Sequence, residues 1–205
     1  MTASPIDSLP ALLPLSLTPG EVEERLADPA RLARAAGDVQ SPDGMRRSAV
    51  LVPVLLHEAP TVLLTLRAAT LSSHAGQVAF PGGRIEPGET PEAAALREAA
   101  EEVGLDPRLP RLAGRLPDLV TGTGFHVVPV VALLEPPVSL TPAPAEVAEV
   151  FEYPLSRLMD PALPERRSGI FGGRVRHYWS WPHETQTVWG ATASMLRSLA
   201  LALRD

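Results

Sequence analysis

The sequence predicts an α+β fold, an α/β/α sandwich in which a mixed β-sheet lies between helices. With 45% hydrophobic residues, the 205-residue chain can bury a substantial core. Runs rich in Leu and β-branched residues at 48–56, 61–67 and 125–135 indicate buried strands. Helical stretches, clearest at 91–103 and 189–204, do not alternate regularly with these runs. A doubly wound parallel sheet needs that alternation, so a mixed sheet is favoured.

Composition limits the classes of partner. The net charge of −6 argues against a nucleic-acid backbone as the main partner. The absence of cysteine excludes disulfides and thiolate chemistry and agrees with a reducing cytosol. The N-terminus lacks the basic segment of a signal peptide, and no apolar run reaches the roughly 18 residues of a membrane span. We therefore expect a cytoplasmic protein with no nucleic-acid or membrane partner.

The chain begins with a Pro/Leu-rich stretch, which predicts an irregular arm. Thr18 before Pro19 is typical of a helix N-cap and first turn, and Pro29 divides the helical stretch 19–36 into short helices. We expect 1–45 to be an arm with short helices that pack on the core, and 46–205 to be the main domain. Three roles for the arm stay open: covering the core, forming a homodimer contact or closing over the site.

The runs at 48–56 and 61–67 are separated by a turn-like stretch and predict a β-hairpin. Pro53 lacks a backbone donor, which indicates an edge position or a bulge in the first strand. Further strands are expected at 112–120, 125–135, 146–155 and 172–181. A helix at 189–204 comes after them.

The segment 91–103 carries both helix-end signals. Thr90 and Pro91 form a second N-cap and first-turn pair, and Gly104 stands where a left-handed residue ends a helix. A helical period groups small apolar residues on one side, namely Leu96, Ala99, Ala100 and Val103. It places three carboxylates on the opposite side, namely Glu98, Glu101 and Glu102.

This acidic face is either a solvated surface or a cation site. Glu98 and Glu102 are a destabilising like-charge pair four residues apart, and the acids lie near the C-terminal end, where the helix dipole disfavours them. A bound cation explains this cost. Oxygen ligands suit Mg²⁺ or Mn²⁺, and Mg²⁺ often binds substrate phosphates together with a few carboxylates. The pattern therefore indicates a phosphate-ester or phosphoanhydride substrate.

The helix lies within a longer pattern of fixed spacing that runs from Gly83 to Leu105. Its fixed positions are Gly83, Glu89, Arg97, Glu98, Glu101, Glu102 and Gly104, with the aliphatic Leu105 next. Across all 23 positions this resembles the Nudix box of the Nudix hydrolase family, with Ala99 in place of a larger aliphatic residue.

The resemblance implies a Nudix fold, with the box as a loop–helix–loop, and a set of catalytic roles. Glu98, Glu101 and Glu102 match the metal-binding glutamates, and the Gly82 carbonyl often completes the coordination. Arg97 and Glu89 match the pair that orients these carboxylates. The family uses Mg²⁺ or Mn²⁺ to help water attack phosphorus in nucleoside diphosphates linked to another moiety. The general base varies within the family and stays open.

Residues 63–83 resemble a second motif, which marks the coenzyme A pyrophosphatases of this family. The substrate-binding positions that it implies are Arg67, Ser72, His74, Gly76 and Phe80. Ser72 departs from the motif because a basic residue is usual there, and a serine hydroxyl adds no charge. Segments 146–155 and 188–196 also look like CoA-directed members.

Other residues keep two interpretations. Arg67 alone fits an ordinary surface arginine as well as a phosphate ligand, and a lone His74 is more often structural. Glu146 and Glu149 fit an extra metal ligand or general base, but a solvent-facing strand is slightly favoured. Three tryptophans fit either core packing or stacking on adenine, with core packing favoured for the last. They are Trp179, Trp181 and Trp189.

The resemblance therefore implies an enzyme that converts the small molecule coenzyme A, and possible derivatives such as its thioesters or oxidised form, to 3′,5′-ADP and 4′-phosphopantetheine. One alternative is a Nudix hydrolase of ADP-ribose, a dinucleotide or a nucleoside triphosphate. A non-catalytic Nudix-fold sensor is the other, and the intact box from Gly83 to Leu105 argues against it.

Overall fold

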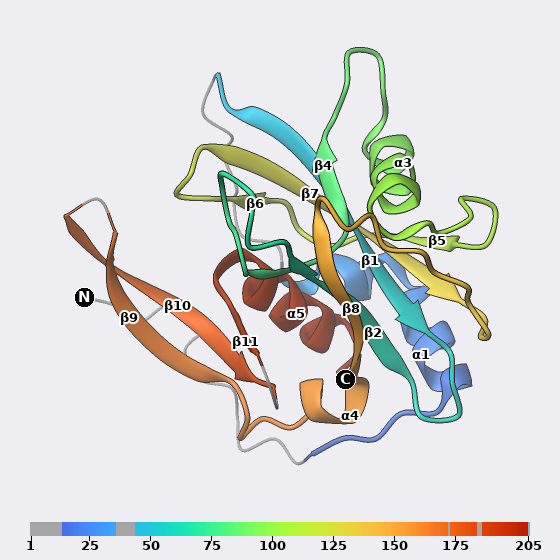
Figure 1. Ribbon diagram of the computed structural model, residues 1–205. Helices are drawn as coiled ribbons and strands as arrows, with labels where there is room; N and C mark the ends of the chain where they lie inside the picture. Colours follow the sequence, from blue (N-terminus) through green and yellow to red (C-terminus); the bar gives the residue numbers. More distant parts are fainter. Residues whose placement is uncertain (1–13, 36–43, 172, 184–185, 205) are drawn as a thin grey trace.

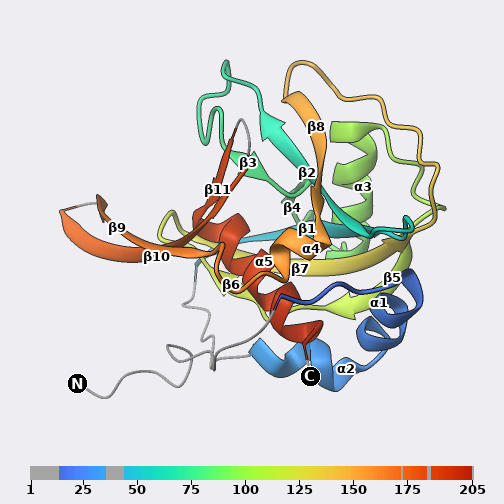
Figure 2. The ribbon, with the colours of Figure 1, turned by 90° about the horizontal axis from the view of Figure 1, so that it is seen from below.

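The computed structural model describes residues 14–35, 44–171, 173–183 and 186–204, and its main body has three layers. Figures 1 and 2 show a mixed sheet with helix α3 (Pro91–Val103) on one face and helix α5 (Gly190–Ala202) on the other. The predicted α+β sandwich is confirmed. No helix within these ranges is long and apolar enough to cross a membrane.

Strand β1 (Arg46–Leu55) lies at the centre of the main sheet. It forms the predicted hairpin with β2 (Thr61–Arg67) and pairs in parallel along its whole length with β7 (Phe125–Leu134). The sheet order is β3-β2-β1-β7-β5, with β4 on β1, β6 on β7 and β8 on β2. The other strands are β3 (Val78–Ala79), β4 (Gly82–Arg84), β5 (Arg111–Arg115), β6 (Leu119–Val120) and β8 (Val147–Pro154).

The edge or bulge predicted from Pro53 is wrong. Pro53 is paired with Ala132 of β7, inside the central strand. On the other side of β1, Val50 pairs with β4 and Val54 pairs with β2. Pro53 therefore lies in the gap where one antiparallel neighbour gives way to the next, and a missing donor is tolerated there.

Two apolar cores lie on the two faces of the sheet. Beneath α3, small residues such as Ala95 and Ala99 are fully buried, which lets the helix backbone approach the sheet closely. The larger core, on the other face, includes α5 and the short helices α1 (Pro19–Leu26), α2 (Pro29–Leu32) and α4 (Leu155–Leu158). A 3₁₀ turn (Ala33–Ala35) comes directly after α2.

The N-terminal helices begin as predicted. Thr18 caps α1 through a reciprocal capping box with Glu21, and Pro19 occupies the first turn. Val22 and Leu26 of α1 are fully buried in the larger core. The predicted irregular arm falls mostly on residues 1–13, which lie outside the described ranges.

A second, three-stranded sheet projects from the main body as an arm (Figures 1 and 2). It consists of β9 (Glu165–Phe171), β10 (Arg174–Pro182) and β11 (Thr187–Trp189), in the order β11-β10-β9. The sequence predicted β10 but not β9, because the strand begins with three charged residues and lacks a strand-like alternation.

Candidate active site

The acidic helix α3 has the predicted ends. The Thr90 hydroxyl accepts a hydrogen bond from the Ala93 amide at 3.2 Å, and Pro91 occupies the first turn. Gly104 caps the other end with φ of 67°, a left-handed conformation that favours glycine. These caps fix where the helix starts and stops, and with that the direction of each glutamate.

The three glutamates do not share one exposed face, contrary to the prediction from the helical period. The side chain of Glu101 is 61% exposed, that of Glu98 is 17% exposed, and that of Glu102 is only 4% exposed. At about 100° per residue, Glu102 lies only about 20° around the helix from Ala95, which faces the sheet. The sheet therefore covers Glu102, while Glu101 points to solvent.

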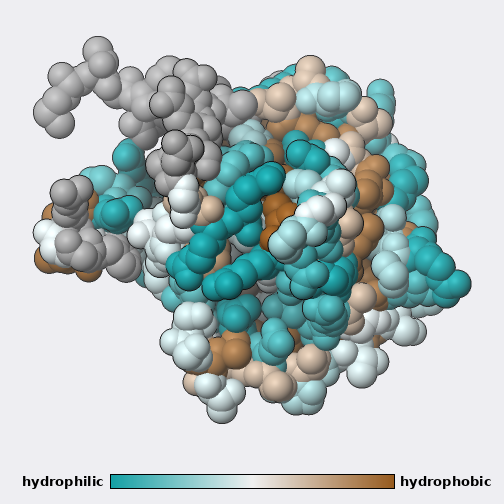
Figure 3. Space-filling view, turned by 90° about the horizontal axis from the view of Figure 1, so that it is seen from above, coloured by the Kyte–Doolittle hydropathy of each residue, from teal (hydrophilic) through white to brown (hydrophobic). Residues whose placement is uncertain are grey.

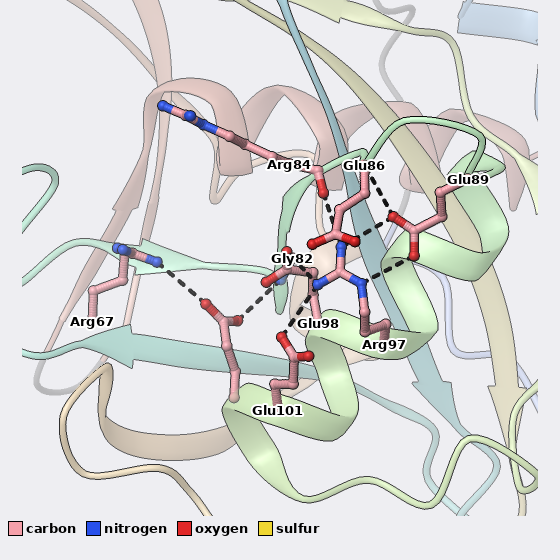
Figure 4. Close-up of polar contacts among 9 residues, drawn as sticks. Arg67, Gly82, Arg84, Glu86, Glu89, Arg97, Glu98 and Glu101 are labelled. Atoms are coloured by element: carbon pink, nitrogen blue, oxygen red, sulfur yellow. Dashed lines mark hydrogen bonds and ion pairs between the residues drawn. The ribbon is translucent and has the colours of Figure 1, made fainter.

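Buried Glu102 is held at both carboxylate oxygens. The Gly82 amide donates to Oε2 at 3.0 Å, and Nη1 of Arg67 lies 3.5 Å from Oε1 (Figure 4). Burial raises the pKa of Glu102 to about 7; the Gly82 hydrogen bond and Arg67 oppose this shift. The charges of Glu98 and Glu146 add to it, so negative charge is crowded here.

Arg97 braces the other carboxylates. Its guanidinium donates to both oxygens of Glu89, at 3.0 and 3.1 Å, and to Glu98 at 2.9 Å. It also donates to Glu101 at 3.2 Å and to the Arg84 carbonyl at 3.0 Å (Figure 4). Hydrogen bonds from Arg97 lower the pKa of Glu89, which stays ionised as the fixed partner of this fork.

Two glycines make room for the carboxylates and the sheet. A Cβ on Gly83 would lie 2.4 Å from the carboxylate carbon of Glu98, so any larger residue there would displace that carboxylate. A Cβ on Gly82 would lie 2.4 Å from the Ala49 carbonyl oxygen of β1. Burial raises the pKa of Glu98, in spite of the opposing hydrogen bond from Arg97.

The donor set fits a hard divalent cation. It offers the carboxylate oxygens of the helix, and the mutual repulsion of Glu98 and Glu102 is what a cation would relieve. Within the described ranges, no three His, Asp or Glu side chains are already gathered as ligands around one point. The geometry gives a reason: Arg97 serves as counter-charge to Glu98 and Glu101.

The structure separates the residues that the CoA-type motif implies. Arg67 reaches Glu102, whereas Ser72, His74 and Gly76 lie on the exposed loop between β2 and β3. His74 contacts Gln77 at 2.9 Å through Nδ1, and the Gly76 amide donates to the Arg67 carbonyl at 3.1 Å. Phe80 is 3% exposed and packs in the larger core.

Glu146 faces the site from another element. It precedes β8, and the amide of Ala68, next to Arg67, donates to its carbonyl at 2.8 Å. Its charge contributes to the raised pKa of both Glu98 and Glu102. The sequence favoured a solvent-facing residue, and the side chain is indeed exposed, as is Glu149. The signal that was missing is the pairing of β8 with β2, which places Glu146 beside Arg67.

Comparisons with known proteins assign this chain to a family. A family model described as NUDIX domain matches residues 45–171. The uncharacterized Nudix hydrolase NudL of Photorhabdus laumondii is 44% identical over 163 residues, 77% of this chain and 85% of that protein. NudL of Pectobacterium atrosepticum is 43% identical over 166 residues, 78% and 84% of the two chains. A crystal structure of the M. smegmatis Nudix hydrolase RenU aligns with 28% identity and a TM-score of 0.47, covering 58% of this chain and 80% of that one.

Proposed function

Because the chain belongs to the Nudix hydrolase family, we propose that it hydrolyses the diphosphate linkage of coenzyme A, giving 3′,5′-ADP and 4′-phosphopantetheine. The substrate assignment rests on the resemblance of residues 63–83 to the CoA-type motif, and one observation connects this segment to the carboxylates. Arg67 and Gly82 stand near the two ends of the CoA-type segment, and both bond to the same buried carboxylate, that of Glu102. The loop between them therefore starts and ends at the proposed catalytic carboxylate.

The residues of the site divide the work. Glu98, Glu101, Glu102 and the Gly82 carbonyl would hold Mg²⁺ or Mn²⁺. When bound, such an ion neutralises charge on the diphosphate and acidifies the attacking water. Arg97 and Glu89 keep Glu98 in its orientation.

Arg67 is suited to the substrate diphosphate. Its Nη1 contact to Glu102 is long, at 3.5 Å, and its Nε is buried without a hydrogen-bond acceptor among the described residues. A guanidinium with spare donors suits a phosphate, because its planar fork matches two phosphate oxygens. We expect Arg67 to bind the diphosphate and to place it next to the glutamates.

A turnover assay tests the substrate assignment. Purified protein with Mg²⁺ or Mn²⁺ is given coenzyme A, ADP-ribose, a diadenosine polyphosphate and a nucleoside triphosphate, and products are separated by chromatography. We expect the highest kcat/KM for coenzyme A, with 3′,5′-ADP as one product. A clearly higher kcat/KM for ADP-ribose would overturn the assignment, and no turnover of any substrate would favour a ligand sensor.

Glu98→Gln is the matched catalytic control for this assay. The amide keeps the size of the side chain but removes its charge, so we expect kcat to fall by a factor on the order of 10²–10³. Full turnover by this variant would contradict the role given to Glu98.

A further inference from the structure

The arm formed by β9, β10 and β11 carries a recess to which the proposed function assigns no role. The recess is shallow and open to solvent, with a volume of about 280 Å³. Its walls are Arg167 of β9, Tyr178 and Ser180 of β10, and Thr187 and Trp189 of β11.

Strand register explains why these side chains share one face. Arg167 pairs with Tyr178, and Ser180 pairs with Trp189 across β10. Because side chains alternate along a strand, Trp179 and Trp181 point to the opposite face. There Trp181 is 2% exposed in the larger core, and the guanidinium of Arg197 from α5 lies 5.1 Å from the Trp179 ring. The recess is therefore on the face turned away from α5.

Two half-buried aromatic rings form part of the wall. The ring centroids of Tyr178 and Trp189 lie 5.6 Å apart at an interplanar angle of 58°. The sequence left core packing and stacking on adenine open for the tryptophans, and the structure gives the core position to Trp181 rather than to Trp189. Partly exposed aromatic faces bind nucleobases by stacking, since every base has a flat π-face.

Positive charge lies on the same face of the arm. Arg167 stands directly across from Tyr178, is exposed, and pairs with Glu165 at 2.7 Å. An exposed ion pair of this kind is weak, so a phosphate can replace the carboxylate. Arg176 lies two residues from Tyr178 on the same strand face, and its Nη1 would be 2.6 Å from a Cβ on Gly122. Gly122 therefore allows this guanidinium to lie along the turn after β6.

The recess is connected to the glutamates through neighbouring strands. The Thr192 hydroxyl, just after Trp189, donates to the Val78 carbonyl of β3 at 2.9 Å. Val78 in turn pairs with Leu66 of β2, the residue before Arg67. Figure 2 shows β11 beside β3 and the loop that joins β2 to β3. These contacts place β11 next to β3, at the end of the loop that begins after Arg67.

We propose that this recess binds the nucleobase end of the substrate, with adenine stacked on Trp189 beside Tyr178 and with Arg167 bound to the ribose phosphate. The identity of the base and the phosphate rests on the proposed function. The chemistry of the recess requires only a flat base that carries a phosphate.

Binding of 3′,5′-ADP to the metal-free protein tests this site without catalysis. The ligand is titrated while tryptophan fluorescence is followed, and adenosine serves as the ligand without phosphate. We expect quenching that is lost in Trp189→Phe, because this variant removes the indole nearest the base. Arg167→Ala should weaken 3′,5′-ADP binding about tenfold or more and leave adenosine binding unchanged.

Two surface variants give the matched controls. Arg166→Ala removes the neighbouring arginine, whose side chain is on the other face of β9, and should leave the Kd of 3′,5′-ADP unchanged. Glu165→Gln removes the competing carboxylate and should tighten 3′,5′-ADP binding but not adenosine binding. Equal Kd values for 3′,5′-ADP in wild type, Arg167→Ala and Glu165→Gln would overturn the proposed site. Both residues are exposed, so neither substitution should disturb folding, and misfolding would not account for a change in Kd.

Steady-state assays separate this site from the reaction itself. If the recess binds the nucleobase end of coenzyme A, Arg167→Ala raises the KM for coenzyme A about tenfold and leaves kcat largely unchanged. Hydrolysis of coenzyme A with an unchanged KM in Arg167→Ala and Tyr178→Ala would overturn the recess and leave the proposed function standing. If the protein binds 3′,5′-ADP through Arg167 but does not hydrolyse coenzyme A, the proposed function is overturned and the recess stands as a binding site.

Discussion

At the scale of single residues, Arg97 connects the carboxylates of the site. It joins the loop carboxylate of Glu89 to the helix carboxylates of Glu98 and Glu101, and it also binds the Arg84 carbonyl. Only a planar guanidinium with several donors can make these contacts together. We propose that it positions the carboxylates and does not itself react.

Arg97→Lys should therefore impair catalysis while keeping the charge. We expect the single ammonium to lose the fork to Glu89, and kcat/KM to fall about 10- to 100-fold. Titration with Mg²⁺ should show a higher concentration needed for half-maximal activity. An unchanged metal requirement together with normal activity would show that the fork does not matter.

Gly83→Ala should disturb the site more than the fold. The added methyl would overlap the Glu98 carboxylate, and a displacement of about 1 Å at a reacting centre can cost about 100-fold in rate. Gly20→Ala is the control, because no atom lies within 4 Å of a Cβ placed there. We expect activity to be lost only in Gly83→Ala, and circular dichroism to be similar for both. Normal activity in Gly83→Ala would mean that Glu98 can move without consequence.

The buried Glu102 predicts how stability changes with pH in the metal-free protein. Its pKa is about 7 in the folded state, above the ordinary 4.5 expected after unfolding. Between these values the folded state binds more protons, so the free energy of unfolding falls as pH rises, by on the order of 3 kcal/mol in total. Denaturant titrations should show this fall between about pH 4.5 and 7. The fall should disappear in Glu102→Gln; equal slopes in both proteins would contradict it.

At the scale of elements, helix α3 shows what local sequence can predict. Its boundaries result from Thr90, Pro91 and Gly104, whose cap roles depend on neighbouring backbone alone. The environment of Glu102 could not be predicted in this way, because the helical period does not say how wide a strip the sheet covers. Strand β9 was missed for a similar reason: its pairing with β10 is what defines it, and its own residues give no alternating pattern.

The cap of α3 gives a prediction for this element. Thr90→Ala removes the hydroxyl that accepts from the Ala93 amide, and we expect a loss of about 1 kcal/mol in unfolding free energy. Activity well below the melting temperature should be kept, since the glutamates lie two turns or more away from the cap. Thermal denaturation, with the exposed Thr70→Ala as control, measures the difference. A destabilisation no larger than that of the control would show that the cap is unimportant.

At the scale of the whole molecule, the sequence predicts the layers of helix and sheet but not which strands pair within the sheet. The apolar runs and amphipathic helices indicated a sheet between helices. The parallel pairing of β1 with β7 was not readable, because the two strands lie far apart in the chain and no local residue specifies the partner. The projecting arm also required the structure; Figure 3 shows hydrophobic surface at its far end, where Ile170 and Val175 are 76% and 66% exposed.

The contacts of the first helices with the last have a consequence for synthesis on the ribosome. Arg25 of α1 donates to the carbonyl of Leu203, and Arg31 of α2 donates to that of Arg204, across 178 and 173 positions of chain. These helices are translated well before their partner carbonyls, which come 178 and 173 residues later. The larger core, which includes Val22 and Leu26, therefore reaches its complete form only after α5 has left the exit tunnel, and until then the nascent chain exposes apolar surface that a chaperone can bind.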